Sequence, residues 1–305
     1  HLSIRRQRQM CIRDSLTDGA VAVAEKMKMP QIVIGLTIVA MGTSMPEFCV
    51  SFISALKGTS DLAVGNIVGS NIFNALLIVG VSALVAPMTI METTVRKDIP
   101  FALVASALLL IMCLDGDISR LDAGILFVMF LIFMYMTLKG AKKQGADAEE
   151  AIEGEGKKPM ATWLSVVWIL VGLLCLIGGS NLFVEGATAV ATNLGVSEAV
   201  IGLTIVAGGT SLPELATSVV SARKGNSGIA IGNALGSNVF NILAILGITG
   251  MITPMTLKGI TYIDLSMLVI SIMLVWLFSF TKYKIERWEG AVLTAVFVGY
   301  IYSLL

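Results

Sequence analysis

The sequence has one histidine, which stands at the first position. Metal binding or acid–base catalysis by histidine is therefore excluded from the body of the chain. Charge is also scarce: Asp, Glu, Lys and Arg make up 14% of the residues, against about 25% in a soluble domain. The four cysteines share no metal-binding spacing, and Cys49, Cys113 and Cys175 lie within apolar runs. These three indicate packing residues and no disulfide framework.

Apolar residues, in contrast, make up 56% of the 305 positions and occur in long runs instead of one-sided stripes. This pattern predicts an all-α polytopic membrane protein. Nine spans are expected, at 30–56, 62–86, 99–114, 121–138, 161–182, 199–222, 229–252, 262–280 and 288–305.

One stretch occurs twice. Ile34–Glu47 is IGLTIVAMGTSMPE and Ile201–Glu214 is IGLTIVAGGTSLPE, and the match continues without a gap to Thr89 and Thr256. Five spans per repeat would give ten in all. Because five is odd, the repeats must cross the membrane in opposite senses, an arrangement typical of secondary transporters with a substrate site at the midplane.

The repeats define the expected domains: 16–138 for the first repeat, 139–159 for a polar linker and 160–305 for the second repeat. Residues 1–15 contain four arginines where the second repeat has the apolar run Trp163–Gly179. They also lack the apolar centre of a signal peptide. We expect a non-native or scar segment in place of most of the first helix, and such a loss would impair transport.

Basic residues predict the orientation. If the linker is cytoplasmic, fourteen lysines and arginines lie on that side and three (Lys57, Arg120 and Lys258) on the other. This is a clear positive-inside bias. The fourteen are Lys26, Lys28, Arg96, Lys97, Lys139, Lys142, Lys143, Lys157, Lys158, Arg223, Lys224, Lys282, Lys284 and Arg287.

The first repeated motif is Gly-Thr-Ser-x-Pro-Glu, at Gly42–Glu47 and Gly209–Glu214. Pro46 and Pro213 should break the helix and free carbonyls near 40–43 and 207–210 to face a cation. Each serine, Ser44 or Ser211, should share a helix face with the glutamate three residues later. Carbonyl, hydroxyl and carboxylate oxygens suit calcium or sodium.

The second repeated motif is Gly-Asn-x-x-Gly-Ser-Asn-x-Phe-Asn, at 65–74 and 232–241. Its polar residues recur every four positions and predict one polar stripe per helix. The alternative is that these amides and hydroxyls only hold helices together. The stripes contain Asn66, Ser70, Asn74, Asn233, Ser237 and Asn241.

Two buried carboxylates in a low dielectric need a neutralising cation, which could be one divalent ion, several monovalent ions or protons. Neither motif contains lysine or arginine, so an anionic substrate is disfavoured. A site that must always be filled suits an exchanger better than a passive channel. An intramembrane enzyme is disfavoured because no histidine could partner a serine and no paired-aspartate pattern is present.

Both motif pairs, their order and the five-plus-five arrangement resemble the sodium/calcium exchanger family of the calcium/cation antiporter superfamily, in its prokaryotic form, from Ser15 to Leu305. The resemblance implies sodium/calcium antiport by alternating access in a prokaryotic inner membrane. The expected partners are these two ions and the lipid bilayer, with no cofactor, no nucleic acid and no particular oligomeric state.

By the same resemblance, Glu47 and Glu214 are the central calcium ligands, and Thr43 and Thr210 add backbone carbonyls. Four serines line flanking sodium sites: Ser44, Ser211, Ser70 and Ser237. Asn74 and Asn241 take the remaining central positions, where some members carry an aspartate. Asp18 and Glu185, near the ends of the first and sixth helices, are candidates for gating or simple boundary carboxylates. Proton-coupled divalent exchange on the same scaffold remains the alternative.

Overall fold

The computed structural model describes residues 30–147, 186, 188–193 and 195–304, and the structural statements below concern these residues. Five helices in this part of the chain are long and apolar enough to cross a membrane, and two bent helix pairs raise the number to seven. The five are Ser60–Val85, Thr94–Asp115, Arg120–Gly140, Ser227–Ile252 and Tyr262–Ser279.

The two bent pairs carry the first repeated motif. In the first repeat, the helix runs through α2 (Gln31–Ile34), η1 (Gly35–Val39) and α3 (Ala40–Thr43), bends by 46°, and continues as α4 (Met45–Leu56). The second repeat has the same bend between α11 (Ala207–Thr210) and α12 (Leu212–Arg223), after α10 (Glu198–Ile201) and η6 (Gly202–Val206). A proline at the second position of α4 and α12 accounts for the break.

The remaining helices follow the repeat. The first repeat has α5 (Ser60–Ile72), η2 (Phe73–Ile78), α6 (Val79–Val85), η3 (Thr94–Asp98), α7 (Ile99–Met112), η4 (Cys113–Asp115) and α8 (Arg120–Asp147). The second has α13 (Ser227–Val239), η7 (Phe240–Ile245), α14 (Leu246–Ile252), α15 (Tyr262–Ser279) and α16 (Arg287–Leu304).

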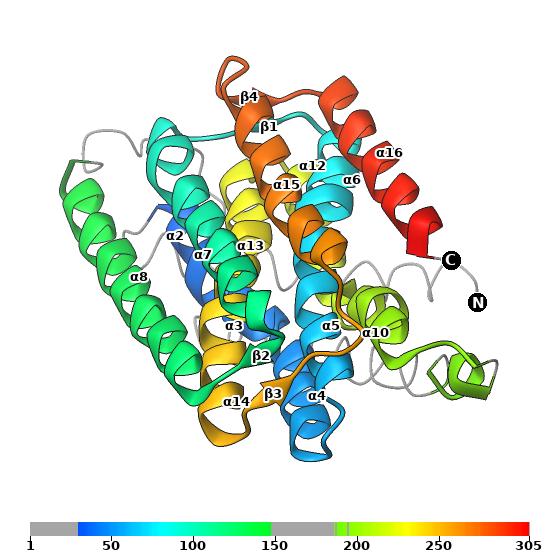
Figure 1. The fold of residues 1–305 in the computed structure, drawn as a ribbon. Helices are drawn as coiled ribbons and strands as arrows, with labels where there is room; N and C mark the ends of the chain where they lie inside the picture. The colour runs from blue at the N-terminus through cyan, green and yellow to red at the C-terminus, as the bar shows by residue number, and fades with distance from the viewer. Residues whose placement is uncertain (1–29, 148–185, 187, 194, 305) are drawn as a thin grey trace, which may run out of the picture.

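The core is built by packing each repeat against the other. The η1 turn of the first repeat lies on α13 of the second, and η6 lies on α5; the blue α2 and α3 beside the yellow α13 are visible in Figure 1. Glycines allow this close approach: a Cβ on Gly236 would lie 2.6 Å from the carbonyl oxygen of Leu36 and 2.8 Å from the Cβ of Ala40. Such small-residue contacts are the usual way for membrane helices to pack tightly.

Two short strand pairs tie the loops together at opposite ends of the bundle (Figure 1). Strand β1 (Met88–Thr89) pairs with β4 (Lys284–Ile285), and β2 (Asp117–Ile118) pairs with β3 (Met255–Thr256). The first pair joins two loops that the charge pattern predicts to be cytoplasmic, and the second joins two loops predicted on the other side. Loop pairing therefore agrees with repeats of opposite sense.

The prediction of an all-α polytopic membrane fold is confirmed. Of the nine predicted spans, 161–182 lies outside the described residues, and α16 is helical but more polar than the seven candidates. The helix α8 continues to Asp147, into the predicted linker, because a helix need not end where its apolar run ends.

Replacement of Gly236 by alanine tests the close packing between repeats. We expect a destabilisation of roughly 1–3 kcal/mol, because the added methyl group overlaps backbone of η1. The matched control is Gly124→Ala in α8, where a Cβ meets nothing within 4 Å and alanine favours the helix. Thermal unfolding in detergent would measure both, and equal midpoints for the two variants would contradict the packing argument.

Candidate cation site

All ten residues predicted to contact ions are fully buried, each with 0% of its surface exposed. Glu47 and Glu214 lie in the first turns of α4 and α12, directly after the bends. The positive end of a helix dipole stabilises a carboxylate at this position. Two buried glutamates in a membrane protein are costly unless something compensates their charge, so this region is the candidate site.

The glutamates are held by serines of the opposite repeat. The hydroxyl of Ser44 donates to Oε1 of Glu214 at 2.9 Å, and the hydroxyl of Ser211 donates to Oε1 of Glu47 at 2.9 Å. The prediction that each serine shares a helix face with the glutamate three residues later did not anticipate these hydrogen bonds between the repeats. Both serines lie at the bend, where the helical register that the expectation assumed is interrupted.

The second oxygen of each carboxylate is different. Oε2 of Glu47 and Oε2 of Glu214 are buried and have no hydrogen-bond partner among the described residues. Buried polar atoms are almost always paired with protein, water or an ion. Each glutamate therefore has one oxygen, Oε1, bonded to the opposite repeat and one oxygen, Oε2, without a partner. The two unpartnered oxygens mark a place for a cation.

Two asparagines that were not among the predicted ligands brace this arrangement. The hydroxyl of Thr43 donates to Oδ1 of Asn233 at 3.1 Å, and Asn233 donates to the backbone carbonyl of Glu214 at 3.3 Å. The other half repeats the pattern with Thr210, Asn66 and the carbonyl of Glu47. Their place in the repeated motif was the available signal, but spacing alone could not assign them a bracing role.

The bracing continues to one more serine in each repeat. Asn66 donates to the hydroxyl of Ser51 at 2.9 Å, and Asn233 donates to the hydroxyl of Ser218 at 3.0 Å. Each asparagine amide thus uses both its nitrogen and its oxygen. These bonds fix the carbonyls of the two glutamates and hence the start of α4 and α12.

The four remaining predicted residues, Ser70, Ser237, Asn74 and Asn241, do not make equivalent hydrogen bonds in the two repeats. Ser237 donates to Oε1 of Glu214 at 3.4 Å, whereas Ser70 lies 3.4 Å from the carbonyl of Ala207 and 3.5 Å from the hydroxyl of Thr210. Asn74 donates to Asn238 at 3.1 Å.

The side chains of Asn74 and Asn241 keep unpartnered atoms within the described part of the chain. Asn74 has a free Oδ1, and both Oδ1 and Nδ2 of Asn241 are free. Both residues lie in π-helical turns, η2 and η7, where the wider turn shifts the register of the polar stripe. Two amide oxygens are therefore available as further ligands.

The expectation of free backbone carbonyls is wrong at Ala40 and Ala207. Each carbonyl accepts the N–H of the serine at the bend, at 3.0 Å, and so completes a helical turn. Gly42 and Gly209 lie within these last turns before the break, in α3 and α11. The break therefore lies after Thr43 and Thr210, where α3 and α11 end.

The gating candidates Asp18 and Glu185 lie outside the described residues.

The donors gathered here are all oxygen atoms of carboxylates, hydroxyls and amides. No group of three or more His, Cys, Asp or Glu side chains occurs in the described ranges, as a transition-metal centre would need. Hard cations such as sodium and calcium fit such a set.

Comparison with known proteins agrees with this chemistry. A family model described as sodium/calcium exchanger protein matches residues 10–139 and 164–305. The chain therefore belongs to the sodium/calcium exchanger family, as its motifs predicted. This is a family of membrane transporters, so the chain is a cation exchanger and not an enzyme.

Individual relatives cover nearly the whole chain. A putative antiporter, CaxA of Alkalimonas amylolytica, is 37% identical over 95% of this chain and 93% of its own. Inner membrane protein YrbG of Escherichia coli (strain K12) is 36% identical over 95% and 91%. A solved structure of the sodium-calcium exchanger NCX_Mj, soaked with Na+ and Ca2+, superposes with a TM-score of 0.80 at 31% identity, covering 96% of this chain and 94% of that one.

The crossed hydrogen bonds can be tested by double-mutant cycles on stability. We expect Ser44→Ala and Glu214→Gln to be coupled by ~0.5–3 kcal/mol, because the two side chains are bonded directly. Ser44→Ala and Glu47→Gln should be closer to additive. Unfolding in mixed micelles measures both cycles, and stronger coupling within the repeat than between repeats would refute the crossed arrangement.

Proposed function

We propose that the protein exchanges sodium for calcium across a prokaryotic inner membrane by alternating access, with the 139–159 linker in the cytoplasm. Glu47 and Glu214 bind calcium between the repeats, helped by carbonyls of Thr43 and Thr210. Sodium occupies flanking positions beside Ser44, Ser211, Ser70 and Ser237, with Asn74 and Asn241 at the centre.

The observation that carries this proposal is the pair of orphaned carboxylate oxygens, Oε2 of Glu47 and Oε2 of Glu214. Because the two glutamates come from opposite repeats, an ion held by both is bound at the junction that alternating access has to rearrange. Without a cation, the two negative charges make it costly to bury the site away from water. The empty carrier is therefore disfavoured from converting between its two open states, so ions cross by exchange and not by leak.

The relatives support the choice of ions. A relative from Methanosarcina acetivorans, named sodium/calcium exchanger MaX1, is 31% identical over 95% of this chain and 93% of its own. NCX_Mj, whose structure superposes on this chain, is a sodium-calcium exchanger. Four serine hydroxyls offer the neutral oxygens that sodium suits: Ser44, Ser211 and Ser237 contact the glutamates, and Ser70 contacts Ala207 and Thr210.

Proton coupling remains the second candidate, favoured by one observation. This site has one carboxylate per repeat and amides at Asn74 and Asn241, and two carboxylates alone could carry protons in exchange for calcium or another divalent cation. The experiment below therefore includes a proton gradient.

Glu214→Gln should abolish calcium uptake into proteoliposomes loaded with sodium and diluted into sodium-free buffer. Removal of one buried charged ligand is expected to weaken calcium binding by about 3 kcal/mol or more, roughly a hundredfold. Glu198→Gln, at an exposed glutamate that begins α10, is the matched control and should transport normally. Robust calcium flux driven by a pH gradient without sodium would overturn sodium coupling.

Alanine at Ser237 tests the flanking sodium positions. The hydroxyl lies 3.4 Å from Glu214 and contributes a neutral oxygen. We expect the sodium concentration for half-maximal calcium uptake to rise about fivefold, for a loss of ~1 kcal/mol, with a smaller change in calcium affinity. The control is Ser303→Ala, near the end of α16 and far along the chain from either motif. Equal shifts in sodium and calcium dependence would argue against separate sodium positions.

A further inference from the structure

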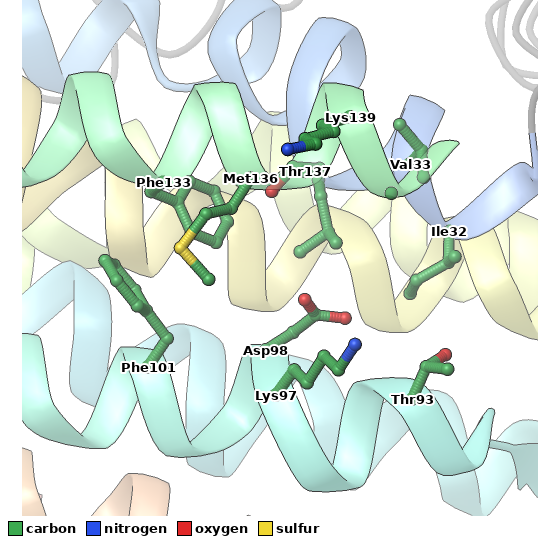
Figure 2. A pocket seen from close by; sticks show the side chains of 12 residues that line it. Ile32, Val33, Thr93, Lys97, Asp98, Phe101, Phe133, Met136, Thr137 and Lys139 are labelled. Carbon is green, nitrogen blue, oxygen red and sulfur yellow. The ribbon is translucent and has the colours of Figure 1, made fainter. Parts of the chain in front are cut away.

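A second site lies away from the two glutamates, between the ends of three spans. A cavity of about 300 Å³ is enclosed by the start of the η3–α7 span, the end of the α8 span and the start of the bent α2–α4 pair. Figure 2 shows Met136 of α8 on one side of this space and Lys97 and Asp98 of η3 on the other, with Lys139 lying along α8. Because all three elements begin or end here, the cavity opens at one face of the membrane, the face that the charge pattern predicts to be cytoplasmic.

The cavity is polar at its mouth and apolar in its depth. Phe133, Val33 and Leu36 in its wall are at most 5% exposed, whereas Lys97 and Lys139 are exposed. Lysines at the ends of membrane helices reach toward the lipid headgroups. A ligand with a charged head and an apolar tail matches this division.

The charges at the mouth are specific. Lys97, Asp98 and Lys139 line the cavity, and the ammonium group of Lys139 lies over the ring of Tyr135 at 5.6 Å from its centroid. The nearby Arg96 is paired with Glu92 at 2.7 Å and does not line it. No ion pair of Lys97, Asp98 or Lys139 within 4.0 Å is found in the described residues. The site therefore offers two cations for a phosphate and one anion for an amine.

We propose that this cavity binds the headgroup of a phospholipid that carries a primary amine, namely phosphatidylethanolamine. Its phosphate binds Lys97 and Lys139, whose exposed side chain turns from the ring of Tyr135 to reach it, and its ammonium group lies against Asp98. Basic pockets between membrane helices are the usual places for phospholipid headgroups. A purely anionic headgroup would leave Asp98 facing negative charge, and a trimethylated amine cannot donate a hydrogen bond to it.

The surface next to the cavity favours a membrane lipid over a soluble phosphate compound. A volume of about 300 Å³ is at the small end for ligand pockets, so it holds a headgroup and little more. From its mouth, exposed apolar side chains continue along α8 toward the bilayer centre and can carry acyl chains. They are Met136 (52% exposed), Tyr135 (65%), Ile132 (48%), Leu131 (52%) and Val128 (54%).

Binding is measured on the purified full chain in detergent, by native mass spectrometry with phosphatidylethanolamine, phosphatidylglycerol and phosphatidylcholine of the same acyl chains. We expect phosphatidylethanolamine to bind most tightly. Lys97→Gln and Lys139→Gln should each weaken all three lipids about tenfold, since each loses a charge-assisted bond to phosphate. Asp98→Asn should weaken phosphatidylethanolamine alone.

Lys57→Gln is the matched control, because Lys57 is an exposed lysine at the end of α4, on the side predicted to be opposite. Its binding of all three lipids should be unchanged, and thermal unfolding shows that each variant is folded. Equal retention of the three lipids by the parent chain, or unchanged binding of phosphatidylethanolamine by Asp98→Asn, would overturn the proposal. Competition by free phosphoethanolamine at the lipid's own concentration would overturn the lipid as the source.

Discussion

The hydrogen bonds that cross between the repeats, from Ser44 to Glu214 and from Ser211 to Glu47, are the interactions on which the site depends. A buried carboxylate needs partners, and here each partner belongs to the other repeat. Neither repeat can complete its half of the site alone. The charge of the glutamates is thereby tied to the contact between the repeats, so a change in the bound ion acts directly on that contact.

Two simple features of the chain make this crossing possible. The prolines lie where one helix ends and the next begins, so each glutamate lies in the first turn of a helix. The positive end of that helix dipole then stabilises its carboxylate. The glycines of α13 and η1 then let backbones approach until Gly236 faces Leu36 directly. Bulkier residues would separate the helices and lengthen the hydrogen bonds at 2.9 Å beyond their useful range.

The sequence was sufficient for the fold class, the family and the burial of the ten site residues, because an internal repeat and a charged residue in an apolar run are both visible without coordinates. It was not sufficient for the contacts. The pairing of Ser44 with Glu214 is between residues 170 positions apart, and helical spacing describes only near neighbours. The π-helical turns η2 and η7 also changed the register after Ile72 and Val239, which a fixed period cannot anticipate.

The near identity of the repeats limits where a preference for one side of the membrane can arise. Of fifteen aligned positions from Val33 to Glu47, thirteen match those from Val200, and the two glutamates and four motif serines are all preserved. One exception is Met41, whose counterpart Gly208 lies beside Phe73: a Cβ added at Gly208 would lie 3.4 Å from that ring. The aromatic contacts themselves follow the repeat: Phe73 packs edge-on against Phe297, and the equivalent pair, Phe240 and Phe130, is also edge-on.

These aromatic contacts lie outside the ion ligands but against the helices that carry them. If the two halves of an inverted repeat were identical, the inward-open and outward-open arrangements would have equal free energy, and the resting state would be set by the ions alone. The difference between Met41 and Gly208 breaks that equality without altering a polar motif residue. Apolar positions beside the site are therefore places where a preference for one side of the membrane can arise.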